Sequence, residues 1–406
     1  MGIKCGDFPN PRHGTMPATQ VLWETAACFP VSGASSRTHR FRHPKDESMT
    51  TVMEPAAART DAWLAADLDE WTVRVVRRHF DPVTGSPYWL ARRPHLGFDP
   101  LDITRYDDLA QFGPFSLATL RELDPVQLVP ADVPRPLAGR IWESGGTTGK
   151  PCRIFHTPSM AEHHTAWRLA GLRLSGFEPG RTWLYACPSG PHIVGRGANQ
   201  IAELYESTVY TMDLDPRWIK TLIRDSRLVE MNMYVEHTIE QMTDVLETGR
   251  VHYLETTPAI MQALISRRPE LVAGLSGVGL GGTQLTPPMY TEIAEALQGG
   301  VIGMTYGNTF GCAMGLPVER DGAILPYLPN YPQVTMAVVD KEDPRRTVGY
   351  GETGRVRLTV LHDDLFLPNI MERDQAVRHR VEGWPCDAVA NVRPLQISSA
   401  APEGLY

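Results

Sequence analysis

Ser144-Gly145-Gly146-Thr147-Thr148-Gly149-Lys150-Pro151 is the stretch that decides the fold. Its glycines let neighbouring backbone N–H groups turn toward one point, because no Cβ stands in the way. The threonine hydroxyls add hydrogen-bond donors, and Lys150 adds a full positive charge. We therefore expect this loop to hold phosphate groups.

The spacing excludes a Walker A loop, which reads GxxxxGK followed by Ser or Thr and leads directly into a helix. Gly145 and Gly149 are too close for that pattern, and Pro151 stands where the magnesium-binding hydroxyl would be. Residues 152–156 alternate as a strand does, so the loop is expected to join two strands. A glycine-rich hairpin that binds no ligand is the alternative interpretation.

Composition and charge are those of a globular protein large enough for more than one domain. The chain has 406 residues, of which 42% are hydrophobic and 21% charged. A net charge of -8 argues against nucleic acid or an anionic membrane as the main partner. The cysteines show no CxxC pair, and no apolar run approaches the roughly 20 residues of a membrane span. We predict a cytoplasmic protein with no membrane partner.

Composition and periodicity divide the chain into four parts. Residues 1–48 are rich in Pro, Gly, Ser, His and Arg, so we expect a poorly ordered extension, with Met49 as a candidate start. A helical period follows at residues 56–80. The expected parts after the extension are an α/β core at 49–315, a β-rich subdomain at 316–381 and a short tail at 382–406.

Strands and helices alternate after the loop, which indicates a parallel sheet covered by helices on both faces. The helices are expected at 157–175, 197–205, 216–225, 237–247, 258–266 and 287–297. The strands are expected at 139–143, 182–187, 251–255, 277–280 and 301–305, with antiparallel ones at 334–339 and 354–361. Ligands of such sheets bind beyond the carboxyl ends of the strands. Small-residue turns at three of these ends, 188–197, 281–284 and 306–309, therefore predict one cleft.

The loop resembles the Ser/Thr-Ser-Gly-Thr-Thr-Gly-Lys-Pro signature of the adenylate-forming superfamily of acyl-CoA synthetases and acyl-AMP ligases. The branch it looks most like is the phenylacetate-CoA ligase-like one. In that superfamily the loop wraps the phosphates of ATP while a carboxylate attacks the α-phosphate and pyrophosphate leaves. The resemblance covers about residues 139–374 and implies the α/β fold of the large N-terminal domain.

The resemblance implies an ATP site built from the loop and three further segments. The family pattern places the phosphates at Ser144, Gly145, Gly146, Thr147, Thr148, Gly149 and Lys150. It places the adenine and the α-phosphate at Gly282, Thr283, Gln284, Tyr306, Gly307, Asn308 and Thr309, and the ribose at Asp374. Lys150 and Thr309 are the expected catalytic residues, because both would stabilise charge that develops at the α-phosphate. The alternatives are a core tyrosine at a strand end for Tyr306 and an exposed acid in a charged loop for Asp374.

The sequence departs from the family at its magnesium ligand. The family glutamate that helps to hold Mg²⁺ is replaced by Phe310, and a phenyl ring offers no oxygen to a hard cation. Mg²⁺ is therefore expected to rest mainly on the phosphates of ATP and on water, with no metal-binding side chain.

The resemblance places the acid substrate beside His192, Arg196 and Gly281. An arginine binds a carboxylate in bidentate geometry, and a histidine pairs with one when protonated. A solvated or hydrogen-bonded histidine is the alternative. Flat walls for an aromatic acid are suggested by Trp183, Tyr185 and Tyr205, with core packing as the alternative.

The chain departs from the family after Asp374. The family's C-terminal domain carries a catalytic lysine, whereas no lysine occurs here after Lys341. We therefore expect the chain alone to form an acyl adenylate and to make acyl-CoA poorly. The acceptor alternatives are CoA, an amine, a hydroxyl or a carrier protein, and the other reading is a non-catalytic nucleotide or acid sensor. A homodimer is an assembly that this reading allows.

Overall fold

The computed structural model describes residues 56–146 and 150–395. The expected extension at 1–48 lies outside the described residues, as do Thr147, Thr148 and Gly149 of the loop. Within the described ranges, no helix combines the length and the apolar character that a membrane crossing needs.

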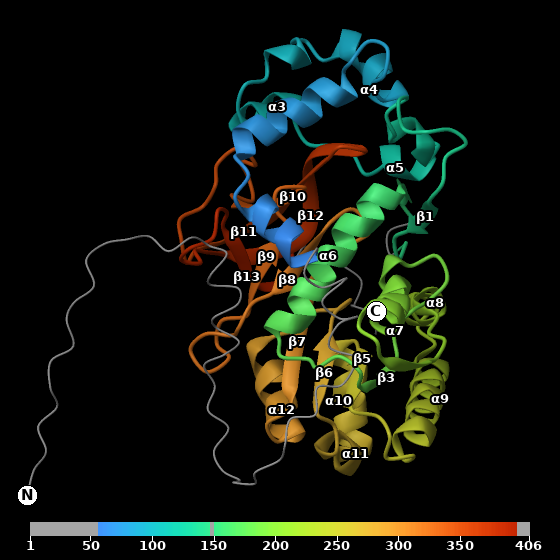
Figure 1. The fold of residues 1–406 in the computed structure, drawn as a ribbon. Helices are drawn as coiled ribbons and strands as arrows, with labels where there is room; N and C mark the ends of the chain where they lie inside the picture. Colours follow the sequence, from blue (N-terminus) through green and yellow to red (C-terminus); the bar gives the residue numbers. More distant parts are fainter. Residues whose placement is uncertain (1–55, 147–149, 396–406) are drawn as a thin grey trace, which may run out of the picture.

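Helices near the N-terminus cover one end of the sheet (Figure 1). They are residues 56–64, α3 (Leu68–His79), α4 (Pro87–Arg92) and α5 (Thr119–Glu122). The prediction of one helix over 56–80 was wrong, because the first helix ends at residue 64 and a second one begins at Leu68. The new start at α3 is capped by Asp67, whose carboxylate accepts a hydrogen bond from the Glu70 N–H at 2.9 Å.

The glycine-rich loop connects two paired strands, as predicted. Strand β1 (Arg140–Glu143) runs antiparallel to β2 (Arg153–His156) in a separate two-stranded sheet. Glu143 lies opposite Arg153 in the register, and their side chains form an ion pair at 2.8 Å. The two strands that flank the loop are therefore held together where the loop begins and ends.

The main sheet has 11 strands in the order β10-β11-β12-β13-β9-β8-β7-β6-β5-β3-β4. Its parallel part consists of β3 (Thr182–Tyr185), β4 (Thr208–Thr211), β5 (Tyr253–Thr256), β6 (Gly277–Leu280) and β7 (Val301–Gly307). The helices along this part are α6 (Pro158–Leu174), α7 (Arg196–Leu204), α8 (Pro216–Arg224), α9 (Leu228–Leu246), α10 (Pro258–Arg267), α11 (Pro269–Ala273) and α12 (Pro287–Leu297). The expected alternation of strands and helices is confirmed.

Most helix starts agree with the prediction because the sequence marks them locally. Thr157, Thr257 and Thr286 each precede a proline, and each side chain accepts a hydrogen bond from a backbone N–H in the first turn of its helix. Helix α9 is the exception, since it begins at Leu228 rather than at 237. Leu228 and Val229 in its first turns are exposed, so the sequence there lacks the buried apolar stripe from which a helix is predicted.

The second half of the sheet is antiparallel and joins the parallel half where β7 pairs with β8. Its strands are β8 (Cys312–Gly315), β9 (Pro326–Pro329), β10 (Val334–Val339), β11 (Thr353–His362), β12 (Leu365–His379) and β13 (Ala388–Pro394). Strand β12 passes through Pro368 by a bulge at Pro368 and Asn369, where the register with β11 shifts. Strand β13 lies inside the stretch expected to be a short tail. Both halves are hydrogen-bonded into one sheet, in which β13, β9 and β8 lie between β12 and β7.

Candidate active site

The base of the glycine-rich loop is closed by hydrogen bonds between Ser144 and Cys152. The Ser144 N–H donates to the Cys152 carbonyl at 2.9 Å, and the Cys152 N–H donates to Ser144 Oγ at 2.9 Å. The Ser144 hydroxyl therefore already holds the loop together. Lys150, at the other side of the loop, is exposed to solvent.

Two glycines of the loop have structural reasons to be glycine. Gly146 has a φ of +66°, a backbone conformation that favours glycine. A Cβ on Gly145 would lie 2.3 Å from Nζ of Lys220, which comes from helix α8. The sequence analysis missed Lys220 because nothing in the local pattern of α8 links it to the loop.

The end of β7 meets β12 through two hydrogen bonds. The Tyr306 hydroxyl donates to Asp374 Oδ2 at 2.9 Å, and Asn308 Nδ2 donates to Glu372 Oε1 at 2.7 Å. Tyr306 and Asp374 are the residues that the resemblance assigned to adenine and ribose. The structure brings them into direct contact, and Asp374 is not an isolated acid of an exposed loop.

Glu372 is a second carboxyl at this corner that the sequence analysis did not assign. Burial, with the neighbouring Asp374 as a further cause, raises the pKa of Glu372 to about 7. Burial also raises the pKa of Asp374, while the hydrogen bond from Tyr306 opposes that shift. The signal was available, because residues 372 and 374 of one strand face the same side.

We expect Glu372→Gln to weaken the pH dependence of stability. Because the folded pKa lies near 7, above the reference value of 4.5, the stabilisation from protonated Glu372 is present at low pH and is lost as pH rises from about 5 to 8. In urea unfolding at pH 5 to 8, the free energy of unfolding of the variant, relative to that of the parent, should rise by roughly 1 to 3 kcal/mol from the lowest to the highest pH. A difference that stays constant with pH would contradict the assignment.

The segment after β7 turns Thr309 and Phe310 inward. Asn308 Oδ1 accepts hydrogen bonds from the N–H groups of Phe310 and Gly311 at 2.8 and 3.2 Å, so the Asn308 side chain shapes the turn. Thr309 and Phe310 are both buried, and Phe310 belongs to the main hydrophobic core. Phe310 therefore packs as an apolar side chain at the place where the family has a metal ligand.

The described residues contain no group of three or more His, Cys, Asp or Glu side chains arranged to hold a metal ion. At the end of β7, the Asn308 amide oxygen is occupied by backbone donors.

The turn after β6 contributes backbone and one unsatisfied hydroxyl. Gly282 has a φ of +83°, and Gly281 packs against the Thr305 carbonyl, which a Cβ would meet at 3.4 Å. Oγ1 of Thr283 is buried and has no hydrogen-bond partner within the described ranges. Gln284 is partly buried beside it. A buried hydroxyl without a partner favours a polar ligand at this wall.

The two predicted acid-binding side chains differ in charge. Burial, followed by the positive charges of Arg217 and Lys220, lowers the pKa of His192 to about 4. His192 is therefore neutral at pH 7 in this structure, so of the two side chains Arg196 is the one that carries a positive charge toward an acid. Arg196 donates from Nη2 to Thr165 Oγ1 at 3.2 Å and is partly buried at the start of α7.

The three aromatic residues expected beside the acid pack into the protein interior. Trp183, Tyr185 and Tyr205 are buried in one hydrophobic cluster. The Tyr205 hydroxyl donates to the Phe177 carbonyl at 2.8 Å, and the ring of Trp183 lies 4.9 Å from that of Phe177. These rings pack in the core, which was the alternative interpretation.

A small cavity of about 30 Å³ lies beside Thr309. Burial lowers the pKa of His156 and His164 in its wall to about 3, so both rings are neutral. Cys312 Sγ lies 3.7 Å from His164 Nε2, but burial raises the pKa of Cys312 to about 12. The pair is therefore a neutral thiol and a neutral imidazole, and the cavity offers hydrogen bonds rather than a thiolate nucleophile.

Solved structures of 2-hydroxyisobutyryl-CoA ligase share this fold. The complex with 2-HIB-AMP and CoA in the thioesterification state aligns with a TM-score of 0.58 at 16% identity, covering 89% of this chain and 74% of the ligase. An open conformation with the same two ligands aligns with a TM-score of 0.57 at 16% identity, covering 91% and 80%. No family model matches the chain, and no curated protein matches it. The chain thus has the mixed α/β fold of the N-terminal domain of adenylate-forming enzymes.

Proposed function

We propose that the protein uses ATP to activate a carboxylic acid as an acyl adenylate and releases pyrophosphate. A carboxylate oxygen of the acid forms a bond to the α-phosphorus, and the bond between the α- and β-phosphates breaks. The fold shared with 2-hydroxyisobutyryl-CoA ligase supports this proposal, as does the glycine-rich loop.

The observation that carries the proposal is the hydrogen bond between Tyr306 and Asp374. The two residues are 68 positions apart in the sequence, and the Tyr306 hydroxyl lies 2.9 Å from Asp374 Oδ2. A nucleoside has its base and its ribose side by side, so its two binding residues must also be neighbours. This contact favours one nucleotide site between β7 and β12.

The residues of this site would share the work of positioning and charge stabilisation. Tyr306 and Gln284 would bound the adenine, and Asp374 would accept hydrogen bonds from the ribose hydroxyls. The N–H groups of the loop, together with Lys150, would hold the phosphates. Thr309 would donate to the α-phosphate, where negative charge develops during the attack.

Magnesium in this proposal is bound through the phosphates of ATP and water rather than by the protein. Phe310, which stands where the resemblance expects a metal-binding glutamate, is part of the hydrophobic core and offers no oxygen ligand. The protein itself would stabilise the negative charge of the phosphates through cationic side chains and backbone N–H donors at the loop.

The acid is the open part of the proposal. The sequence predicted an aromatic acid, but the rings on which this prediction rested are buried in the core. The cavity beside Thr309, at about 30 Å³, has room for about one water and does not select between classes of acid. A substrate screen should therefore pair aromatic acids with small hydroxy acids.

Acid-dependent exchange of labelled pyrophosphate into ATP tests the function. We expect exchange with at least one acid of the panel and no exchange when the acid is omitted, because pyrophosphate returns to ATP only through an acyl adenylate. Trapping with hydroxylamine would identify the activated acid. Nucleotide binding without exchange for any acid would contradict the proposal.

A non-catalytic nucleotide or acid sensor is the second candidate function, and the burial of Phe310 favours it. The same assay separates the two, since a sensor binds ATP and releases no pyrophosphate. For an active enzyme, mass spectrometry with CoA, amines, alcohols and a carrier protein would identify the acceptor.

A further inference from the structure

Lys220 lies against the glycine-rich loop, although it comes from a distant element. It belongs to helix α8 (Pro216–Arg224), and its Nζ lies 2.3 Å from the point that a Cβ on Gly145 would occupy. The ammonium group therefore fills the space that the missing side chain of Gly145 leaves. The chain holds only four other lysines, Lys4, Lys45, Lys150 and Lys341.

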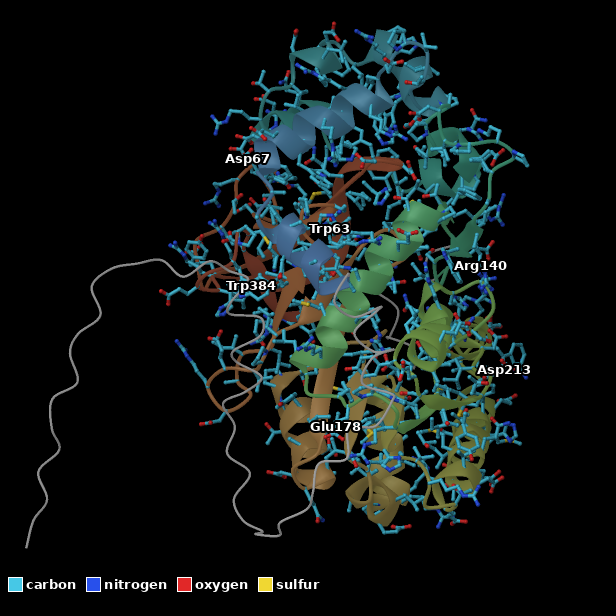
Figure 2. The ribbon with its side chains drawn as sticks, in the orientation of Figure 1. Trp63, Asp67, Arg140, Glu178, Asp213 and Trp384 are labelled. Carbon is cyan, nitrogen blue, oxygen red and sulfur yellow. The ribbon has the colours of Figure 1, made fainter. Side chains whose placement is uncertain are left out.

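An ion pair holds helix α8 against the hairpin. Arg217, one turn before Lys220, donates from Nη2 to the Glu143 carboxylate at the end of β1, and Glu143 also pairs with Arg153. Figure 2 shows Arg140 of the same hairpin and Asp213, shortly before α8, on the same side of the molecule. The position of Lys220 at the loop is thus set by contacts between α8 and β1.

Two positively charged side chains act on Lys220, Arg373 of β12 and Arg217 of α8. Other charged or titratable groups near this part of the molecule include Asp215, the N-cap of α8, Glu143 and Arg153 of the hairpin, and His192. Glu143 forms ion pairs with two arginines, and Asp215 accepts from the N–H groups of Arg217 and Trp218 at 2.9 and 3.1 Å. His192 is neutral at pH 7. Burial, then Arg373 and Arg217, lower the pKa of Lys220 to about 8.

We propose that Lys220 binds the phosphates of ATP and the released pyrophosphate at Gly145. The inference rests on the proposed function for its ligand, and it adds a residue that the sequence motifs do not include. A cation held beside other cations and partly out of water gains when an anion arrives, because the anion replaces lost hydration and screens the repulsion. Lys220 would thus supply charge to the loop from the main body of the protein.

Pyrophosphate binding measured by calorimetry, with Mg²⁺ present, tests this inference. Lys220→Met should bind pyrophosphate about 10- to 100-fold more weakly than the parent, as expected for one lost charge-assisted contact. Lys220→Arg should keep most of the affinity. Lys341→Met, in an exposed turn between β10 and β11, is the matched control and should bind like the parent.

Proton uptake gives a second readout in the parent protein itself. Because Lys220 is about half charged at pH 8, pyrophosphate binding should draw in up to about half a proton, measured in buffers of different ionisation enthalpy. Acetylation at pH 7.5 followed by peptide mass spectrometry should also show pyrophosphate protecting Lys220 but not Lys341.

Three results would overturn the inference: a parent protein that binds no pyrophosphate, a folded Lys220→Met that binds it as tightly as the parent, or acetylation of Lys220 unaffected by pyrophosphate. Failure of the proposed function looks different. In that case no acid supports exchange, while pyrophosphate still binds the parent and Lys220→Met still loses affinity.

Discussion

Lys150→Ala is expected to slow acid-dependent exchange of pyrophosphate into ATP by about 100- to 1,000-fold, the usual loss when one preorganised charge or donor at a transferring phosphoryl group is removed. The Lys150 side chain is exposed, so its removal should change the free energy of unfolding by no more than about 0.5 kcal/mol. The measurement is the exchange rate at subsaturating ATP, together with a urea unfolding curve.

Lys341→Ala is the matched control for Lys150→Ala, because it removes an exposed lysine from a turn far from the loop in sequence. It should exchange at the parent rate. Equal rates for Lys150→Ala and the parent would remove Lys150 from the mechanism. The Lys220 variants would then show whether Lys220 binds the phosphates without help from Lys150.

Arg168→Met is expected to lower the free energy of unfolding by about 3 to 5 kcal/mol, the cost of leaving one partner of a buried ion pair uncompensated. Arg168 of α6 donates from Nη2 to Glu255 Oε2 of β5 at 2.8 Å, and their side chains are only 15% and 7% exposed. Without Arg168, the Glu255 carboxylate would remain buried without its cation. Urea unfolding at pH 7 measures the change.

Two further variants separate the buried charge from a general loss of packing. Arg168→Met combined with Glu255→Gln removes both charges and should recover most of the lost stability. Arg59→Met breaks the exposed pair with Glu162 and should cost less than about 1 kcal/mol. A double variant no more stable than Arg168→Met would contradict the explanation.

Local signals in the sequence were enough for the hairpin and most of the helices. A glycine-rich loop followed by alternating residues predicts two paired strands, because both signals lie within a few positions of each other. The threonine–proline starts of α6, α10 and α12 place these helices for the same reason, since a cap is formed by neighbouring residues. The overall fold class followed from these elements and from the family resemblance.

The sequence also named most of the residues at the candidate nucleotide site without placing them together. Tyr306 and Asp374 were assigned separately, and only the folded structure brings their side chains to 2.9 Å, although β13, β9 and β8 lie between their strands in the sheet. Glu372 and the neutral state of His192 depend on burial, which a linear sequence does not state. The aromatic acid was inferred from side chains that the fold uses for its core.

The sequence by itself determined a glycine-rich loop on a hairpin, an alternating α/β body and the turns at its strand ends. The tertiary structure alone decided that the antiparallel strands continue the parallel sheet, that Glu255 forms an ion pair with Arg168, and that Lys220 lies at Gly145. The physical reason is distance along the chain. Capping and turn formation act between near neighbours, whereas strand pairing, burial and the field at a charged group sum over residues that only folding brings together.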